Sequence, residues 1–122
     1  MAKKILFVED ESALQKALSE ILAEEGYQAI QALDGEDGLR LAKSELPELI
    51  LLDLILPKKD GFSVLEELKK DSATKDIPVL ILSNLDRAED IERATSLGAK
   101  SYLVKTDYKL PEIVQKIKEV LG

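Results

Sequence analysis

The feature that most constrains the fold of this 122-residue chain is a set of short, uninterrupted apolar runs. ILFV, LILL and VLIL occupy residues 5–8, 49–52 and 79–82, and segments with apolar residues at helical spacing lie between them. A strand with one solvated face alternates apolar and polar residues, whereas a central parallel strand is buried on both faces and is apolar throughout. The runs therefore predict a parallel sheet covered by helices on both sides.

Strand-like and helix-like segments alternate five times along the chain. Strands are expected at residues 4–8, 27–32, 48–52, 79–82 and 101–104. Helices are expected from Ser12 to about Gly26, after a cap at Asp34, from Gly61 to Lys70, from a cap at Asp86 to near Gly98, and over residues 110–121. Because parallel crossovers are right-handed, the alternation predicts one doubly wound α/β domain over residues 1–122, with five parallel strands and five helices.

The segment RAEDIERATSLG at residues 87–98 differs from the other expected helices. Ile91 and Leu97 are its only large apolar residues. A helix with so little to bury is either a short helix on the rim of the fold or one that moves and presents a binding face. The sequence leaves both interpretations open.

Polar side chains follow four of the expected strands. In an open parallel sheet, ligands bind beyond the carboxyl ends of the strands. The residues delivered there are Glu9 and Asp10, Asp53, Ser83 and Asn84, and Lys105 and Thr106. We therefore expect three carboxylates, a hydroxyl and an ammonium to converge on one edge of the sheet.

Each of these residues also has an ordinary explanation. Asp10 or Glu11 could start a helix. Asp53 could accept hydrogen bonds from loop amides, and Ser83 could cap locally. A lysine such as Lys105 is usually solvated at the surface. The combination favours function, because one chemistry uses all of these groups together.

That chemistry is metal-assisted phosphoryl transfer. Neighbouring carboxylates repel one another, and a divalent cation relieves the repulsion. The chain has no histidine or cysteine, so hard oxygen ligands favour Mg²⁺, with Mn²⁺ as a second possibility. A carboxylate beside such an ion can attack phosphorus to form an acyl phosphate. A lysine and a hydroxyl then neutralise charge on the transferring group.

The whole chain resembles the receiver domains of two-component response regulators. The resemblance is carried by VEDES at residues 8–12, LLDLILPKKDG at 51–61, ILSN at 81–84 and LGAKSYLVK at 97–105. It implies a flavodoxin-like sheet of strand order 2-1-3-4-5. It also implies that Asp53 accepts a phosphoryl group from the phosphohistidine of a histidine kinase or phosphotransfer protein.

The resemblance also implies roles for the other residues of the expected site. Metal ligands would be Glu9, Asp10, Asp53 and the backbone carbonyl of Ile55, and phosphoryl contacts would be Ser83 and Lys105. Tyr102 would swing inward as Ser83 moves, switching a face formed by the fourth helix, fifth strand and fifth helix for a downstream protein target. Such a domain is not an enzyme with a separate substrate, because it catalyses only its own phosphorylation and dephosphorylation.

The chain departs from the family pattern at three positions. Thr106 follows the lysine where the family usually has a cis-linked proline. A non-proline cis bond costs about 3–4 kcal/mol, so the Lys105–Thr106 bond is expected to be either trans with a reshaped loop or strained. Asn84 and Ile55 replace residues that are usually small and polar, respectively. We expect them to obstruct the attacking water and to make the phosphorylated state long-lived.

Composition and charge bear on partners and location. The net charge of −7, from 24 acidic and 17 basic residues, disfavours nucleic-acid binding, so no direct nucleic-acid partner is expected. No apolar run approaches the ~18 residues of a membrane span, and no export leader opens the chain. A cytoplasmic protein without a membrane partner is therefore expected, either monomeric or dimerising on phosphorylation.

Three alternatives remain beside the phospho-accepting domain. The first is a pseudo-receiver that binds partners without using phosphorylation, and Thr106 is its best support. A Mg²⁺-dependent phosphatase is disfavoured, because Ile55 stands where such an enzyme would need a second acid. A nucleotide- or flavin-binding protein is weaker still, because the chain has no glycine-rich phosphate loop and no tryptophan.

Overall fold

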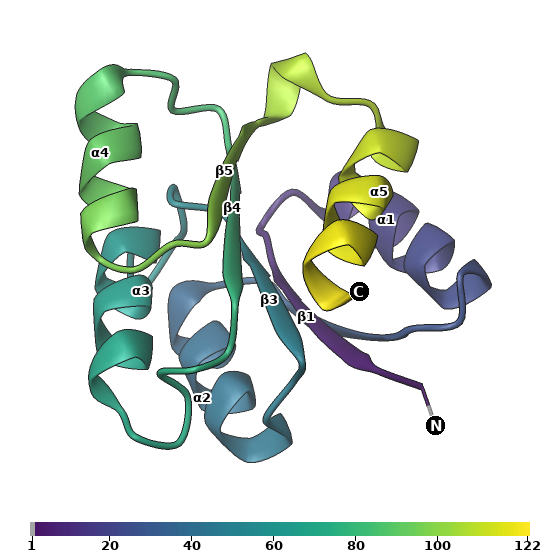
Figure 1. Ribbon diagram of the computed structural model, residues 1–122, viewed down its shortest axis with the longest axis horizontal. Helices are drawn as coiled ribbons and strands as arrows, with labels where there is room; N and C mark the ends of the chain where they lie inside the picture. Colours follow the sequence, from purple (N-terminus) through teal and green to yellow (C-terminus); the bar gives the residue numbers. More distant parts are fainter. Residues whose placement is uncertain (1) are drawn as a thin grey trace.

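A computed structural model describes residues 2–122 as a parallel sheet between two layers of helices (Figure 1). The strands are β1 (Lys4–Val8), β2 (Gln28–Ala32), β3 (Leu49–Leu52), β4 (Val79–Ser83) and β5 (Ser101–Val104). The helices are α1 (Ser12–Glu24), α2 (Gly35–Glu45), α3 (Gly61–Lys70), α4 (Ala88–Ser96) and α5 (Leu110–Leu121). The strand order is β2-β1-β3-β4-β5. The predicted fold class and strand order are confirmed.

The apolar residues of each central strand divide between two cores, one on each face of the sheet. Leu6 and Val8 of β1 pack into the core beneath α2, α3 and α4. Ile5 and Phe7 pack into the core beneath α1 and α5. Successive side chains of a strand point to opposite faces, so a strand covered on both sides must be apolar at every position. This requirement explains the apolar runs.

The two predicted aspartate caps have different outcomes. Asp34 caps α2 as predicted, because its side chain accepts a 2.8 Å hydrogen bond from the N–H of Asp37. The predicted cap at Asp86 is wrong, since α4 begins one residue later with Arg87 as its N-cap and no side-chain hydrogen bond caps it. Arg87 keeps an extended backbone (φ −74°, ψ 144°), so the helix cannot begin until Ala88.

Helix α4 is only weakly anchored to the fold. Ala94 is its only fully buried residue, whereas Ile91 and Leu97 are partly buried. The guanidinium of Arg93 also lies 4.1 Å from the ring centre of Phe62 on α3, a cation–π contact. The predicted shortage of buried apolar residues in this helix is confirmed.

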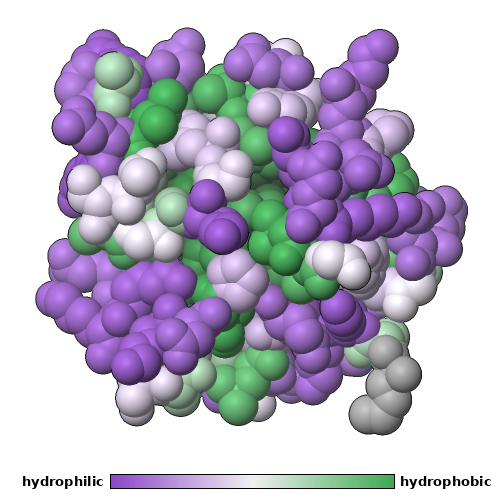
Figure 2. Space-filling model, viewed as in Figure 1, coloured by the Kyte–Doolittle hydropathy of each residue, from purple (hydrophilic) through white to green (hydrophobic). Residues whose placement is uncertain are grey.

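The outer faces of the helices are polar. In α5, for example, Ile113 and Ile117 are buried while Glu112 and Glu119 are exposed. On the face drawn in Figure 2, hydrophobic residues show through the middle of the molecule and hydrophilic residues surround them. Across residues 2–122, no helix combines the length and the apolar character that crossing a membrane requires.

Candidate functional site

The register of the sheet brings Glu9 and Asp53 side by side. Val8 is the partner of Leu52 across β1 and β3, so the next residue of each strand leaves the sheet at the same level. The N–H of Asp53 still donates to the carbonyl of Val8 at 3.0 Å. The two acids are therefore held by the ends of adjacent strands, as the sequence predicts.

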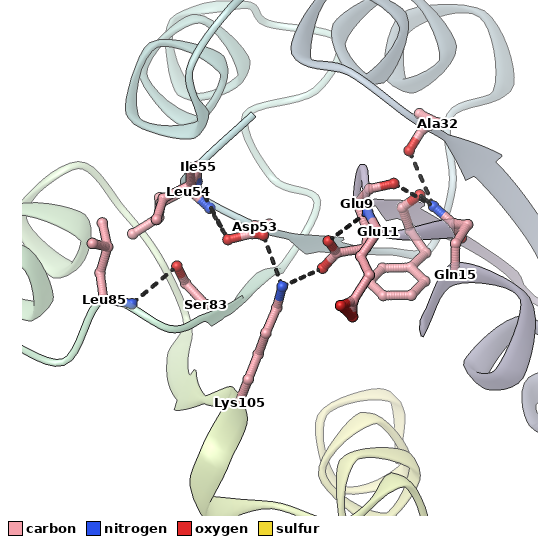
Figure 3. Close-up of polar contacts among 11 residues, drawn as sticks. Glu9, Glu11, Gln15, Ala32, Asp53, Leu54, Ile55, Ser83, Leu85 and Lys105 are labelled. Carbon is pink, nitrogen blue, oxygen red and sulfur yellow. Dashed lines mark hydrogen bonds and ion pairs between the residues drawn. The ribbon is translucent and has the colours of Figure 1, made fainter. Parts of the chain in front are cut away.

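The buried carboxylate of Asp53 is compensated on both of its oxygens. Oδ1 accepts hydrogen bonds from the N–H groups of Leu54 (2.7 Å) and Ile55 (3.3 Å). Oδ2 accepts a 2.9 Å hydrogen bond from Nζ of Lys105 (Figure 3). Asp53 is only 4% exposed. A buried anion is tolerated when it is paired and hydrogen-bonded, so these contacts explain how an acid can follow a buried strand.

Glu9 is more deeply buried than Asp53 and less well satisfied. It is 0% exposed. Its Oε2 accepts from the N–H of Glu11 at 3.0 Å, and its Oε1 lies 2.7 Å from Nζ of Lys105. Apart from this ion pair, Oε1 accepts no hydrogen bond of good geometry from the described residues. Burial raises the pKa of Glu9 above its ordinary value, and the ion pair with Lys105 and the hydrogen bond from Glu11 only partly oppose this.

Lys105 therefore bridges two carboxylates from neighbouring strands. Burial alone would lower the pKa of its ammonium, but the close contacts with the carboxylates of Glu9 and Asp53, together with their charges, outweigh burial and raise it. Its side chain is 16% exposed, so little solvent reaches the cation. The lysine acts as an internal counter-ion for this end of the sheet.

The three acids also form a cluster suited to a metal ion. One oxygen from each of Glu9, Asp10 and Asp53 lies within 4.8 Å of the other two, and Asp10 is the exposed member of the cluster. The donors are all hard oxygens, and Oε1 of Glu9 has no well-formed hydrogen bond to give up. These residues fit a divalent cation of the Mg²⁺ or Mn²⁺ type. The carbonyl of Ile55 as a further ligand stays a prediction.

Ser83 and Tyr102 meet at the backbone of Leu85. Oγ of Ser83, which is fully buried, accepts from the N–H of Leu85 at 3.3 Å. The hydroxyl of Tyr102 donates to the carbonyl of Leu85 at 2.6 Å. Burial, followed by the charges of nearby aspartates, raises the pKa of Tyr102 to about 12. The hydroxyl beside the acids and the aromatic ring of β5 are thus linked through one residue of the β4–α4 loop.

Gly61 allows the β3–α3 loop to fold tightly behind Asp53. A Cβ at this position would lie 2.2 Å from the carbonyl oxygen of Asp53 and 2.5 Å from Cα of Leu54. The N–H of Gly61 also donates to the carbonyl of Leu54 at 2.9 Å. No side chain fits here without displacing the backbone that carries Asp53.

Thr106, Ile55 and Asn84, which depart from the receiver pattern, all lie just beyond strand ends. All described peptide bonds are trans, including that between Lys105 and Thr106, which lies within a 3₁₀ turn at Lys105–Asp107. Of the two expected outcomes for this bond, the trans form is the one found. Ile55, two residues after Asp53, is 57% exposed, and Asn84, directly after Ser83, is also exposed, so both side chains face solvent just beyond the ends of β3 and β4.

One buried polar residue near the site was not predicted from the sequence. Gln15 of α1 is 1% exposed and donates to carbonyl groups at the end of β1. Its position did carry a signal, because Gln15, Leu18, Ser19 and Leu22 are the buried residues of α1 and follow helical spacing. Two polar residues on a buried stripe indicate internal hydrogen bonding.

Comparison with known proteins identifies a family. A family model described as a response regulator receiver domain matches residues 5–118. The DNA-binding dual master transcriptional regulator RpaA of Synechocystis is 39% identical over 118 residues, which cover 97% of this chain and 48% of RpaA. The phosphate regulon transcriptional regulatory protein PhoB of Escherichia coli is 36% identical over 121 residues, which cover 99% of this chain and 52% of PhoB.

A solved structure is similar as well. The Mn²⁺-bound form of response regulator Rcp1 superposes with a TM-score of 0.82 at 34% identity, covering 95% of this chain and 91% of that one. Rcp1 is thus a protein of the same fold that has been solved with a divalent cation bound. The acidic cluster described above is compatible with such an ion.

The relatives overturn one expectation about partners. The chain spans about half the length of the curated relatives it matches. Both relatives are transcriptional regulators by name, and RpaA is named as DNA-binding. The prediction of no direct nucleic-acid partner is therefore wrong. That prediction rested on the net charge of −7, which describes these 122 residues alone. A net charge gives no information about residues that are not counted in it.

Proposed function

Because the chain belongs to the response regulator receiver domain family, we propose that it accepts a phosphoryl group on Asp53 and transmits this state as a signal. The donor is the phosphohistidine of a histidine kinase or phosphotransfer protein. One observation carries the proposal: Asp53 is a buried carboxylate held between the ammonium of Lys105 and two backbone N–H groups, beside an acidic cluster.

The residues that would hold Mg²⁺ are Glu9, Asp10, Asp53 and the carbonyl of Ile55. When bound, the ion supplies positive charge that offsets the negative charge of the phosphoryl oxygens. The hard donor set and the Mn²⁺-bound relative Rcp1 support a divalent cation here. Lys105 now pairs with both Glu9 and Asp53, so metal binding requires its ammonium to give up part of that contact.

The transfer itself needs few groups from the chain. A carboxylate oxygen of Asp53 attacks phosphorus, the bond from phosphorus to the imidazole nitrogen breaks, and the imidazole leaves with the electron pair. The ammonium of Lys105 faces the oxygens that become more negative. The hydroxyl of Ser83 accepts from Leu85 and keeps its own proton available for a phosphoryl oxygen.

The contacts at Leu85 offer a route for the signal. If Ser83 turns toward a phosphoryl group, its hydrogen bond to the N–H of Leu85 is disturbed, and the carbonyl that Tyr102 holds moves with it. The weak anchoring of α4 means that a shift of this loop meets little resistance. Ser83 and Tyr102 are thus the two ends of the proposed switch.

The proposed output is control of transcription in the cytoplasm. RpaA and PhoB are transcriptional regulators, and this chain corresponds to about half of each. We place phosphorylation upstream of DNA binding, with the receiver changing what it contacts rather than releasing a product. In this role the chain acts chemically only on itself, adding and losing its own phosphoryl group.

A small-molecule phosphodonor tests the proposal. Treatment with acetyl phosphate and Mg²⁺ should add the mass of one phosphoryl group to the intact protein, as measured by mass spectrometry. Omitting Mg²⁺ or substituting Asp53→Asn should abolish the gain. A wild-type chain that stays unmodified while remaining folded would favour the alternative of a pseudo-receiver.

A further inference from the structure

Gln15, in the first turn of α1, is a buried polar residue that the proposed chemistry does not use. It is 1% exposed, and its carboxamide lies between α1 and the ends of β1 and β2. Buried amides are retained where their hydrogen bonds are satisfied. The partners of Gln15 therefore indicate what it holds in place.

Both polar atoms of this carboxamide are engaged. Nε2 donates to the carbonyl oxygens of Phe7 (2.9 Å), Glu9 (3.2 Å) and Ala32 (3.1 Å), as Figure 3 shows. Oε1 accepts a 3.2 Å hydrogen bond from the hydroxyl of Ser19, one turn further along α1. An amide nitrogen has two N–H groups, so the three carbonyls share them. One side chain thus joins a helix to two strands where they leave the sheet.

The carbonyl of Glu9 is the most informative of these partners. It belongs to the peptide group that joins Glu9 to Asp10, and a peptide group is planar. The orientation of that plane sets the directions in which the two acidic side chains leave the backbone. Within residues 2–122, no other hydrogen bond to this carbonyl is found, and the N–H of Asp10 donates none to a backbone carbonyl. The strand ladder has already ended here, so Gln15 provides the restraint that the sheet no longer supplies.

We propose that Gln15 is a positioning residue for metal binding. By holding the Glu9–Asp10 peptide, it orients the two carboxylates toward a shared cation before that cation arrives. The inference rests on the proposed function, because it takes the divalent-cation site as given. Ligands that are already ordered lose less conformational freedom on binding. A neutral amide also satisfies the carbonyls without placing a positive charge beside the cation.

A purely structural role makes a different prediction. If Gln15 only ties α1 to the sheet, its loss lowers the stability of the fold. The Mg²⁺ affinity then changes no more than in another variant that is destabilised by the same amount. The direct readout is therefore the dissociation constant for Mg²⁺, measured by calorimetric titration of the unphosphorylated protein. Gln15→Met keeps the length of the side chain and removes both N–H donors.

The matched control is Val114→Ala on α5, which removes buried apolar atoms from the core beneath α1 and α5 and leaves the acidic cluster of Glu9, Asp10 and Asp53 unchanged. The free energies of unfolding of both variants are first measured with urea. Each variant is then titrated with Mg²⁺ under conditions in which it is folded. Gln15→Met should bind Mg²⁺ about tenfold more weakly than the wild type, as is usual when a partner of a ligand is lost. Val114→Ala should bind like the wild type. Equal affinities in all three proteins would overturn the inference while leaving the proposed function intact.

A milder variant tests the same inference if Gln15→Met does not fold. Ser19→Ala leaves Gln15 in place but removes the hydroxyl that orients its carboxamide. Mg²⁺ affinity should fall, by less than in Gln15→Met. Wild-type affinity in Ser19→Ala, with Gln15→Met unfolded, would overturn the positioning role. Wild-type protein that binds no Mg²⁺ would instead contradict the proposed function, and the inference with it.

Discussion

The ammonium of Lys105 donates a 2.9 Å hydrogen bond to Oδ2 of Asp53, although 52 residues separate them in the sequence. The contact forms because Lys105 follows β5 and Asp53 follows β3, and both strands end at the same edge of the sheet. The same ammonium lies 2.7 Å from Oε1 of Glu9. One cation therefore balances two buried anions when no metal is bound.

Replacing Lys105 should distinguish its role as a counter-ion for the buried carboxylates from its proposed role in phosphoryl transfer. Lys105→Met leaves two buried carboxylates unpaired and should destabilise the fold by about 3 kcal/mol without metal. Saturating Mg²⁺ should recover part of the loss, because the cation then takes over the charge balance. Phosphorylation by acetyl phosphate should slow by on the order of 10²-fold. Urea unfolding with and without Mg²⁺, together with phosphorylation rates, checks both effects, and a stability loss that Mg²⁺ does not reduce would contradict the counter-ion role.

A methyl group at residue 61 should disturb the acceptor itself. In Gly61→Ala the new Cβ would lie 2.2 Å from the carbonyl oxygen of Asp53, so the backbone at Asp53 must move. We expect a loss of stability of about 1–3 kcal/mol and weaker binding of Mg²⁺. Gly26→Ala is a useful control, since open space surrounds that position although its φ is +92°. It should lower stability without affecting Mg²⁺ affinity. Equal Mg²⁺ affinity in the two variants would show that Asp53 tolerates the displacement.

Asp60 should stabilise the start of α3 in a pH-dependent way. Partial burial opposes its charge, but hydrogen bonds from the N–H (3.1 Å) and hydroxyl (3.0 Å) of Ser63 outweigh burial and lower the pKa of Asp60. Its contribution is therefore present above the ordinary value of 3.8 and is lost as pH falls through the lower folded-state pKa. Asp60→Ala should cost about 1 kcal/mol at neutral pH and less in acid.

The control for this effect is Asp60→Asn, which retains a capping oxygen but cannot ionise near these pH values. Its stability difference from the wild type should be small at neutral pH. Urea unfolding of all three proteins over a pH series measures the effect. A cost of Asp60→Ala that stays constant down to strongly acidic pH would show that the charge of the cap contributes nothing.

The lifetime of the phosphorylated state should depend on the two exposed residues beside the site. Ile55 and Asn84 both face solvent just beyond the ends of β3 and β4, where they would obstruct a water molecule approaching the acyl phosphate. The double variant Ile55→Asn, Asn84→Ala should lose its phosphoryl group several-fold faster, a change of about 1 kcal/mol in the barrier. The decay of the phosphorylated mass with time gives the rate, and an unchanged rate would remove this explanation.

Much of the fold could be predicted because its strands and buried faces leave strong patterns in the sequence. ILFV and LILL are apolar at every position, and the structure shows why: alternate residues serve two different cores. The weak anchoring of α4 was equally visible. The start of α4 was not, because Asp86 satisfies the capping preference while the backbone at Arg87 stays extended. A local propensity does not fix where a loop turns into a helix.

The candidate site, like the fold, could be predicted from the sequence only in part. Strand ends predicted that Glu9, Asp53 and Lys105 converge, since parallel strands share one carboxyl edge. Gln15 was missed because a glutamine in a helix is usually solvated, and only its place on the buried stripe argued otherwise. The nucleic-acid expectation failed for another reason. Net charge describes the surface of the residues counted, whereas the matched relatives are about twice as long.

The most direct test of the central claim is to locate the phosphoryl group on the chain. Borohydride reduces an acyl phosphate to an alcohol, so peptide mapping by mass spectrometry after phosphorylation and reduction identifies the modified carboxylate. The account predicts that residue 53 alone is converted, only when Mg²⁺ was present during phosphorylation. Conversion at another acid, or at Asp53 in equal yield without any divalent cation, would contradict it.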